Sequence, residues 1–228
     1  MRLLLKLCPN RTPVEFNHLH ILAGALHKWL GPNDEHDGLS LYSFSWLKGS
    51  VVRDGALHFP NGAQWYISAL DDDFLVRSIG GIFRDPGIRW EMQVANVEVM
   101  PLPVFPNGTS EQRFEVLSPV LIKRKIPNSD KPDGFEEKHY LYTDPESDAL
   151  LTETLQHKLR AAGLPAEGVS VRFDRSYPKA KTQKVMYRNI GNMANYCPVF
   201  VCGTAEQLAF GWTVGVGSST GVGFGSLM

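Results

Sequence analysis

The chain has 228 residues, of which 43% are hydrophobic and 21% charged, and its formal net charge is -1. This length and hydrophobic content predict one large domain or two of about 110 residues with packed cores, and they exclude a disordered chain. No apolar stretch approaches the roughly 20 residues that span a bilayer, and Cys8, Cys197 and Cys202 lack the spacing of a disulfide scaffold or a zinc site, so we expect a soluble protein of the cytoplasm.

Strands and helices alternate in the first half of the chain. Residues 2–8 are an apolar run that we interpret as a buried strand, because Lys6 interrupts it too soon for an export signal. The pair Thr12-Pro13 is typical of a helix cap and first turn, and the helix is predicted to end at about Leu30. The elements expected next are strands over residues 39–47 and 62–70, a helix over 72–83 and a strand over 92–100. This order predicts a ferredoxin-like α+β domain, in which helices cover an antiparallel sheet.

A proline-rich stretch, residues 101–108, separates this unit from a less regular second half. The elements expected there are strands over 114–125 and 139–142, a helix over 147–162 closed by Gly163, strands over 169–173 and 199–202, a short helix over 204–210 and a final strand near Trp212. We therefore predict two tandem ferredoxin-like domains, an N-terminal one over residues 1–108 and a C-terminal one over residues 109–228.

The C-terminal end is rich in glycine. Five glycines fall within eleven residues, directly after the last predicted strand: Gly215, Gly217, Gly221, Gly223 and Gly225. Glycine permits a positive φ and a close approach of the backbone, so successive N–H groups can cradle phosphate oxygens. The spacing is not a dinucleotide fingerprint, because the third glycine of G-x-G-x-x-G would fall on Thr220, and there is no Walker lysine. A phosphate cradle and a plain tight loop both stay open at this point.

The same segment carries a resemblance to a known family. Residues 217–225, a glycine, five variable residues and Gly-Phe-Gly, resemble the C-terminal glycine-rich loop of the RAMP superfamily of RNA-binding proteins. The approach to the loop, VFVCG at 199–203, is similar to that of the CRISPR-associated endoribonucleases that cut precursor RNA at each repeat. Further segments match in the same order: RLLLKL at 2–7, NH at 17–18, AGAL at 23–26, LYSFS at 41–45 and LSPV at 117–120.

This resemblance implies an activity and its partners. Precursor RNA would lie across two adjacent ferredoxin-like domains and be cleaved by attack of a ribose 2′-hydroxyl on the adjacent phosphate. The products would be a 5′-hydroxyl and a 2′,3′-cyclic phosphate, and no metal or other cofactor is implied. The partner would be CRISPR repeat RNA, with other subunits of a CRISPR effector complex as further candidates and no membrane. A monomer and a homodimer both stay open.

Four of the seven histidines, His18, His20, His27 and His36, fall within nineteen residues. Histidine, with an ordinary pKa near 6.5, can act as base or acid in this reaction at neutral pH. The resemblance places His27 where members of the family carry a Tyr or a second active-site His. It places His36, in a polar turn, where the family commonly carries its catalytic His. We therefore predict that His27 and His36 are catalytic, with His20 in reserve.

The net charge gives no support to RNA binding, so the support has to be local. Six basic residues lie close together with only Asp174 opposing them: Arg172, Arg175, Lys179, Lys181, Lys184 and Arg188. We predict that these residues and the five glycines contact RNA, although a solvated segment would show the same pattern. Some members of the family carry a Lys shortly after the catalytic His, where this chain has Ser40 and then Lys48. The stabilising cation therefore stays open.

Three alternatives remain beside cleavage of repeat RNA. A RAMP subunit that binds guide RNA without cutting would share the fold and the loop, and the pair His27 and His36 favours cleavage over it. An enzyme that binds a nucleotide through the glycine loop would need a following helix or a Walker motif. A metal nuclease would need paired acidic residues, and the sequence shows no such spacing.

Overall fold

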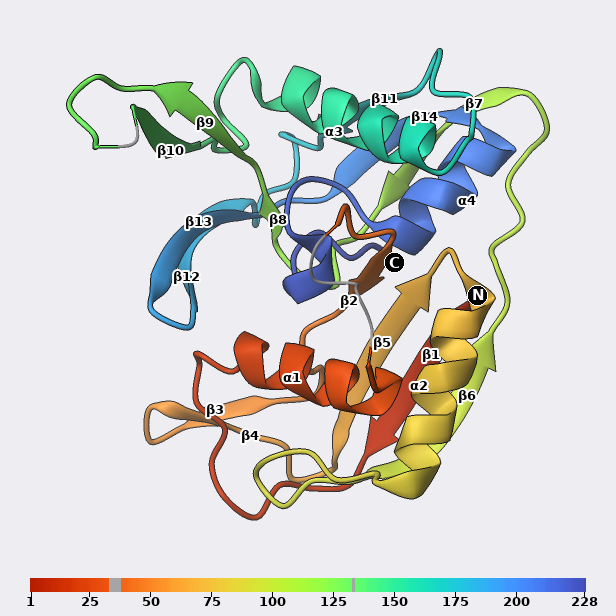
Figure 1. The fold of residues 1–228 in the computed structure, drawn as a ribbon, viewed down its shortest axis with the longest axis vertical. Coiled ribbons are helices and arrows are strands. Elements are labelled where there is room, and N and C mark those ends of the chain that lie inside the picture. Colours follow the sequence, from red (N-terminus) through yellow and green to blue (C-terminus); the bar gives the residue numbers. More distant parts are fainter. Residues whose placement is uncertain (33–37, 133) are drawn as a thin grey trace.

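The chain folds into two α+β units that lie one above the other in Figure 1. The computed structural model describes residues 1–32, 38–132 and 134–228. The N-terminal unit contains, in order, β1 (Arg2–Leu7), α1 (Leu19–Leu30), β2 (Tyr42–Phe44), β5 (Ala63–Ala69), α2 (Asp72–Arg84) and β6 (Val94–Met100). Its sheet has the order β2-β5-β1-β6 with antiparallel neighbours. This is the ferredoxin-like arrangement that the order of predicted elements indicated.

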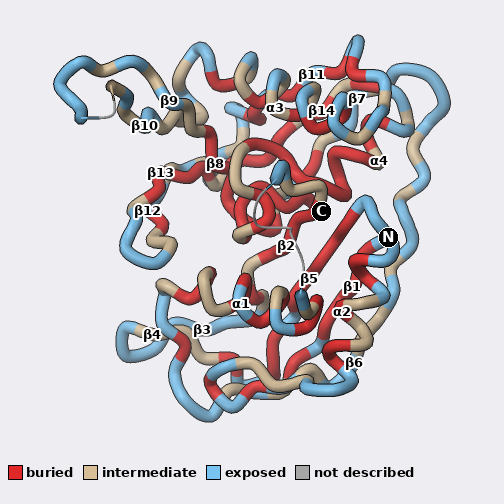
Figure 2. The backbone as a smooth tube through the Cα atoms, in the orientation of Figure 1, coloured by how far each residue is buried: buried red, intermediate tan, exposed pale blue. Residues whose placement is uncertain are grey.

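The two helices of this unit pack closely together. A Cβ atom at Gly81 of α2 would lie 2.1 Å from the backbone oxygen of Trp29 in α1, so only glycine fits there. Trp29 is also in contact with Trp65 of β5, with ring centroids 5.6 Å apart. The core of the N-terminal unit therefore lies between α1, α2 and the sheet, and most of β1 and β5 is coloured as buried in Figure 2.

The predicted start of the first helix is wrong. The helix begins at Leu19, not at Thr12, because Val14 in the preceding segment pairs with a hairpin that was not predicted from the sequence. This hairpin consists of β3 (Val51–Arg53) and β4 (Ala56–His58). Val14 and Leu57 exchange two backbone hydrogen bonds of 3.0 and 2.8 Å, which remove residue 14 from any helix.

The C-terminal unit repeats the same plan with insertions. Its main elements are β7 (Thr109–Phe114), α3 (Ser147–Ala161), β11 (Ser170–Phe173), β14 (Val199–Thr204) and α4 (Ala205–Val214), and the sheet order is β11-β14-β7. The last residues take the place of the fourth strand, because Leu227 bridges Val116 just beyond β7. The inserted strands are β8 (Val120–Leu121), β9 (Lys123–Pro127), β10 (Phe135–His139), β12 (Lys181–Tyr187) and β13 (Ile190–Tyr196).

The predicted final strand near Trp212 is also wrong, since Trp212 lies inside α4. This helix begins with a capping box between Thr204 and Gln207 and is buried almost all round. A short apolar run that is buried on every side has no periodicity to separate helix from strand. The glycines at the C-terminal end therefore follow the end of a helix and not the end of a strand.

The two units meet through residues that are far apart in sequence. The buried guanidinium of Arg2 in β1 donates a hydrogen bond of 2.9 Å to the backbone oxygen of Trp212 in α4 and stacks on its ring. Residues 101–108 contain neither helix nor strand and run along the edge of the molecule from β6 to β7 (Figure 1). The domain boundary at residue 108 stays a prediction. Within the described ranges no helix is both long and apolar enough to cross a membrane.

Candidate functional site

The glycine-rich segment, residues 215–225, is packed between the two units. Gly215 ends α4 with a φ of 73°, and its N–H donates to the oxygen of Gly211. A Cβ atom at Gly217 would lie 2.5 Å from the backbone oxygen of Leu121, and one at Gly223 would lie 2.8 Å from the ring of Phe44 in β2. These glycines therefore allow the segment to fit between β8 and β2. Contact of the five glycines with RNA stays a prediction.

A short 3-10 helix in this segment, η1 (Thr220–Val222), is bound to β2 by two hydrogen bonds. The hydroxyl of Thr220 donates to the backbone oxygen of Tyr42 at 3.0 Å. The phenol of Tyr42 in turn donates to the backbone oxygen of Gly221 at 3.2 Å. A Cβ atom at Gly221 would lie 2.3 Å from the hydroxyl of Ser40, so the loop approaches this edge of the N-terminal unit very closely.

His27 lies beside this junction. It is a partly exposed residue in the last turn of α1, and its Nε2 atom is 3.5 Å from the phenol oxygen of Tyr42. The structure thus brings one predicted catalytic histidine to the glycine-rich segment through a single tyrosine. The second, His36, lies outside the described residues. Tyr42 was not singled out by the sequence analysis, although it lies in the segment LYSFS that carries the resemblance.

A buried lysine supports the segment from its other side. Lys158 of α3 donates hydrogen bonds to the backbone oxygen of Val214 at 3.2 Å and to the hydroxyl of Thr220 at 2.8 Å. Burial lowers its pKa to about 7, because the charged ammonium loses its hydration. Lys158 was not among the site residues predicted from the sequence. The available signal was its place on the apolar face of the helix, seven residues after Leu151 and three after Leu155.

The two histidines at the start of α1, His18 before the helix and His20 within it, have different surroundings. His18 is buried before the helix, and its Nδ1 atom is 2.9 Å from the backbone oxygen of Glu15. Burial lowers the pKa of His18, which favours the neutral ring. His20 is partly exposed and packs edge-on against Tyr187 of β12 at 6.5 Å. The hairpin β12–β13 therefore reaches the start of α1, where Asn17 donates to the backbone oxygen of Arg188 at 2.8 Å.

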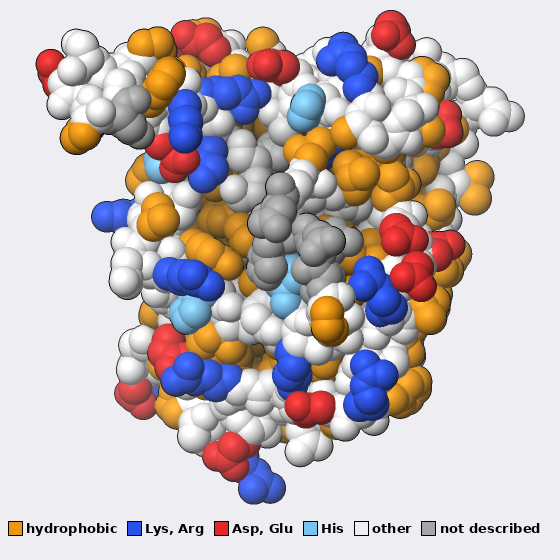
Figure 3. Space-filling model, in the orientation of Figure 1, with side chains coloured by type: hydrophobic (Ala, Val, Ile, Leu, Met, Phe, Trp, Pro, Cys, Tyr) orange, Lys and Arg blue, Asp and Glu red, His pale blue; other side chains and the backbone are white. Residues whose placement is uncertain are grey.

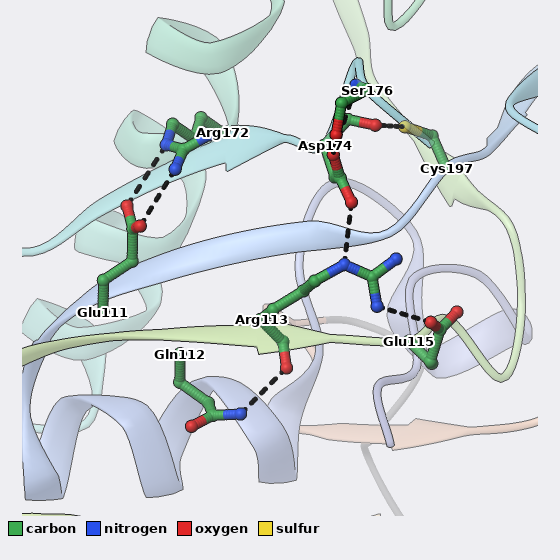
Figure 4. A network of polar contacts seen from close by, with 8 residues as sticks. All are labelled: Glu111, Gln112, Arg113, Glu115, Arg172, Asp174, Ser176 and Cys197. Carbon is green, nitrogen blue, oxygen red and sulfur yellow. Dashed lines mark hydrogen bonds and ion pairs between the residues drawn. The ribbon is translucent and has the colours of Figure 1, made fainter. Parts of the chain in front are cut away.

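The six basic residues between 172 and 188 do not form one surface. Arg172 lies on β11 and is bidentate with Glu111 of β7, with a closest approach of 2.9 Å (Figure 4). Arg175 pairs with Asp148 at 2.5 Å, at the start of α3. The remaining basic residues, Lys179, Lys181, Lys184 and Arg188, lie on or next to the hairpin β12–β13. Figure 3 shows basic and acidic side chains interspersed over the face it views.

The lysines of the hairpin have fewer polar partners than the two arginines. Among the described residues no carboxylate forms an ion pair with Lys179, Lys181 or Lys184. Lys181 lies 5.3 Å from the centre of the Tyr196 ring, a cation–π distance. The contacts of all six basic residues with RNA stay a prediction. Among these six, the lysines on or beside the hairpin lack a carboxylate partner in the described part of the chain.

Comparison with known proteins agrees with this architecture. The sequence model of a family described as CRISPR associated protein Cas6, C-terminal, matches residues 101–228. No curated protein matches the chain in sequence. Among solved structures, "CRISPR associated protein Cas6" has a TM-score of 0.80 at 21% identity, covering 100% of this chain and 98% of that one. "Characterization of a Cas6-related gene from Pyrococcus furiosus" has a TM-score of 0.85 at 17% identity, covering 100% and 97%. "An RAMP protein binding different RNA substrates" has a TM-score of 0.81 at 17% identity, covering 100% and 98%.

Proposed function

The chain belongs to the Cas6 family of CRISPR-associated proteins, and we propose that it cuts CRISPR repeat RNA without a metal ion. The nucleophile in this proposal is the ribose 2′-hydroxyl next to the scissile phosphate. Its attack forms a 2′,3′-cyclic phosphate and releases a 5′-hydroxyl. Cuts in successive repeats would release mature guide RNA. The reaction needs a base for the 2′-proton, an acid for the leaving oxygen and positive charge near the phosphate.

The observation that carries this proposal is the place of His27. It is partly exposed on α1, and Tyr42 joins it to the glycine-rich segment, whose sequence resembles the RNA-binding loop of the superfamily. The phenol of Tyr42 donates to the backbone oxygen of Gly221, and the same phenol oxygen is 3.5 Å from Nε2 of His27. Imidazole can serve as either the general base or the general acid of this reaction, which is the role proposed for His27.

The proposed roles of the remaining groups follow from the chemistry. His36 is the proposed partner of His27, and one of the two would act as base while the other acts as acid. The lysines of the hairpin β12–β13 would contact the RNA backbone, because phosphates supply most of the electrostatic affinity for nucleic acids. The proposed partner is therefore the repeat RNA itself. Binding to other effector subunits and the choice between monomer and homodimer also stay predictions.

The test uses repeat RNA from the same genome in which the single ribose before the scissile phosphate is replaced by deoxyribose. We expect this RNA to bind normally and to stay uncut, because the change removes a single hydroxyl from a large binding surface. Deoxyribose at the next nucleotide provides the matched control, which should be cut. Mass spectrometry of the control products should show a 2′,3′-cyclic phosphate and a 5′-hydroxyl, with the same rate in excess chelator.

Each alternative predicts a different result. A metal nuclease activates water, so it would cut the deoxy-substituted RNA and stop in chelator. A subunit that only binds guide RNA would bind both RNAs and cut neither. Cleavage at the deoxy position, or products with a 5′-phosphate, would refute attack by the 2′-hydroxyl and the roles proposed for the two histidines.

A further inference from the structure

Lys158 is a lysine in the core of the C-terminal unit. Its side chain is 2% exposed, and its neighbours on the same face of α3, Leu155 and Leu159, are fully buried. Among the described residues no carboxylate pairs with it. Its hydrogen-bond acceptors are the backbone oxygen of Val214 and the hydroxyl oxygen of Thr220. Burying an ammonium group without a carboxylate destabilises the fold, so other groups must stabilise the ammonium of Lys158 in the core.

The end of α4 supplies part of that stabilisation. Val214 is the last residue of this helix, where backbone oxygens lack N–H partners within the helix and the helix dipole is negative. The ammonium group of Lys158 is therefore stabilised by a helix end. Thr220 supplies the rest. Its only hydroxyl hydrogen is directed to the backbone oxygen of Tyr42, so its oxygen accepts the hydrogen bond from Lys158.

These two contacts fix both ends of the first half of the glycine-rich segment. Val214 and Thr220 bracket residues 215–219, and one ammonium group holds them together. Thr220 and the next residue, Gly221, each bind Tyr42, whose phenol oxygen is 3.5 Å from Nε2 of His27. A continuous series of polar contacts thus runs from the C-terminal unit, through the segment, to His27 in the N-terminal unit.

We propose that Lys158 is a positioning residue that holds the glycine-rich segment against Tyr42 and thereby sets the geometry of His27 for RNA cleavage. This inference rests on the proposed function. Lys158 is a positioning residue and not a catalytic one, because its hydrogen bonds within the described residues go to Val214 and Thr220, through which it acts. Its removal should therefore reduce the rate of the cleavage step more than it reduces RNA affinity.

The test compares Lys158→Met, which keeps the length of the side chain, with Thr220→Val, which keeps its shape. We expect the single-turnover rate at saturating RNA to fall about 10-fold or more in each variant, with Kd within about threefold of the natural chain. The double variant should be no slower than the slower single variant, because both substitutions interrupt the same series of contacts. Thr213→Val is the matched control, since among the described residues the hydroxyl of that buried threonine donates to Ala209 within α4.

Several outcomes would overturn the inference. Cleavage at the natural rate by folded Lys158→Met or Thr220→Val would overturn it. So would a double variant whose rate is reduced by the product of the two single-variant factors. If Lys158→Met does not fold, Thr220→Val alone decides, because it removes one hydroxyl only. A defect confined to Kd would also contradict a positioning role in the cleavage step.

A second measurement does not depend on cleavage. Hydrogen exchange should accelerate in Lys158→Met at the amides of Val216, Ser218 and Gly225, which bond to residues of the segment or of the adjoining β8 region. The amides of β1 should be unchanged. If the natural chain leaves repeat RNA whole, the proposed function fails, and this exchange pattern then decides whether Lys158 positions the segment. Natural exchange rates in the segment would refute it.

Discussion

Lys158 makes the stability of the fold depend on pH, and the substitution Lys158→Met should remove that part of the dependence. Burial lowers the pKa of this lysine from 10.5 to about 7, whereas it keeps its ordinary value in the unfolded chain. Below pH 7 the ammonium is charged in both states, and the desolvation penalty is fully present. Between pH 7 and 10.5 only the unfolded chain retains the proton, so rising pH progressively favours the folded state.

The size of the effect follows from the two pKa values. Between pH 7 and pH 9 the free energy of unfolding of the natural chain should rise by about 2 kcal/mol more than that of Lys158→Met. Lys48, whose pKa burial lowers to about 8, contributes a rise of the same sign in both proteins and cancels in the comparison. Burial raises the pKa of Cys197 to about 11 and lowers that of His18, so these groups titrate mainly outside the window.

Urea unfolding at several pH values between 7 and 9 measures this difference. The two proteins should show equal m-values, and their free energies of unfolding should diverge by about 1 kcal/mol per pH unit. A measurable divergence of the opposite sign, or two parallel lines, would refute the argument that Lys158 is buried with its proton weakly held. The same titration with Thr213→Val should follow the natural chain.

The remaining predictions concern the histidines and one glycine. His27→Ala and His36→Ala should each slow cleavage by about 100-fold and leave Kd within a few-fold, as expected for acid–base groups. His157→Ala, at an exposed position on α3, should cleave at the natural rate. Equal rates in all three variants would refute the assignment. Gly223→Ala should destabilise the fold by about 1–3 kcal/mol, because its φ is +95° and a Cβ would lie 2.8 Å from an aromatic carbon of β2. Gly24→Ala, in an open helical position, should instead stabilise it by about 0.5–1 kcal/mol; thermal unfolding compares the two.

Local sequence signals were sufficient where the local preference and the tertiary structure agree. Asp71 caps α2, and Gly163 follows the end of α3, so both helices were predicted nearly to their ends. The start of α1 was missed because Thr12-Pro13 favours a helix locally, whereas pairing of Val14 with β4 makes the segment extended. That pairing joins residues 43 positions apart, Val14 and Leu57, which a local pattern cannot reveal.

Some residues of the candidate site could likewise be predicted from the sequence, and others could not. His27 could be found because the resemblance assigned a role to its position. Lys158 could not, since its spacing on α3 marks only a lysine on an apolar face and does not identify Val214 and Thr220 as its partners. The partners of Arg172 and Arg175 are likewise distant in sequence, so the charge pattern could not show that these two arginines are already paired.

That pairing makes the basic segment testable as two separate groups. Lys179, Lys181 and Lys184 lie on or beside the hairpin, whereas Arg172 and Arg175 each face a carboxylate that would repel a phosphate. Neutralising the three lysines to glutamine should weaken RNA binding and reduce the slope of log K against log salt by about 2–3, roughly one unit for each phosphate that a lysine neutralises. Neutralising the two arginines should leave that slope within experimental error, because each guanidinium already has its counterion in the protein.

The lysine variant and the arginine variant both lower the net charge of the protein, so their comparison separates general electrostatic attraction from local contact. A general electrostatic attraction would weaken binding in proportion to the charge removed, so the effect of the arginine variant would be two thirds of that of the lysine variant. Local contact on the hairpin predicts weaker binding in the lysine variant alone. Filter binding at four salt concentrations distinguishes these outcomes, with thermal unfolding as the control for folding. The slope of log K against log salt could instead fall as much per removed charge in the arginine variant as in the lysine variant. That result would show that the ion pairs with Glu111 and Asp148 open to admit RNA. It would also show that the hairpin is not the preferred site of phosphate binding.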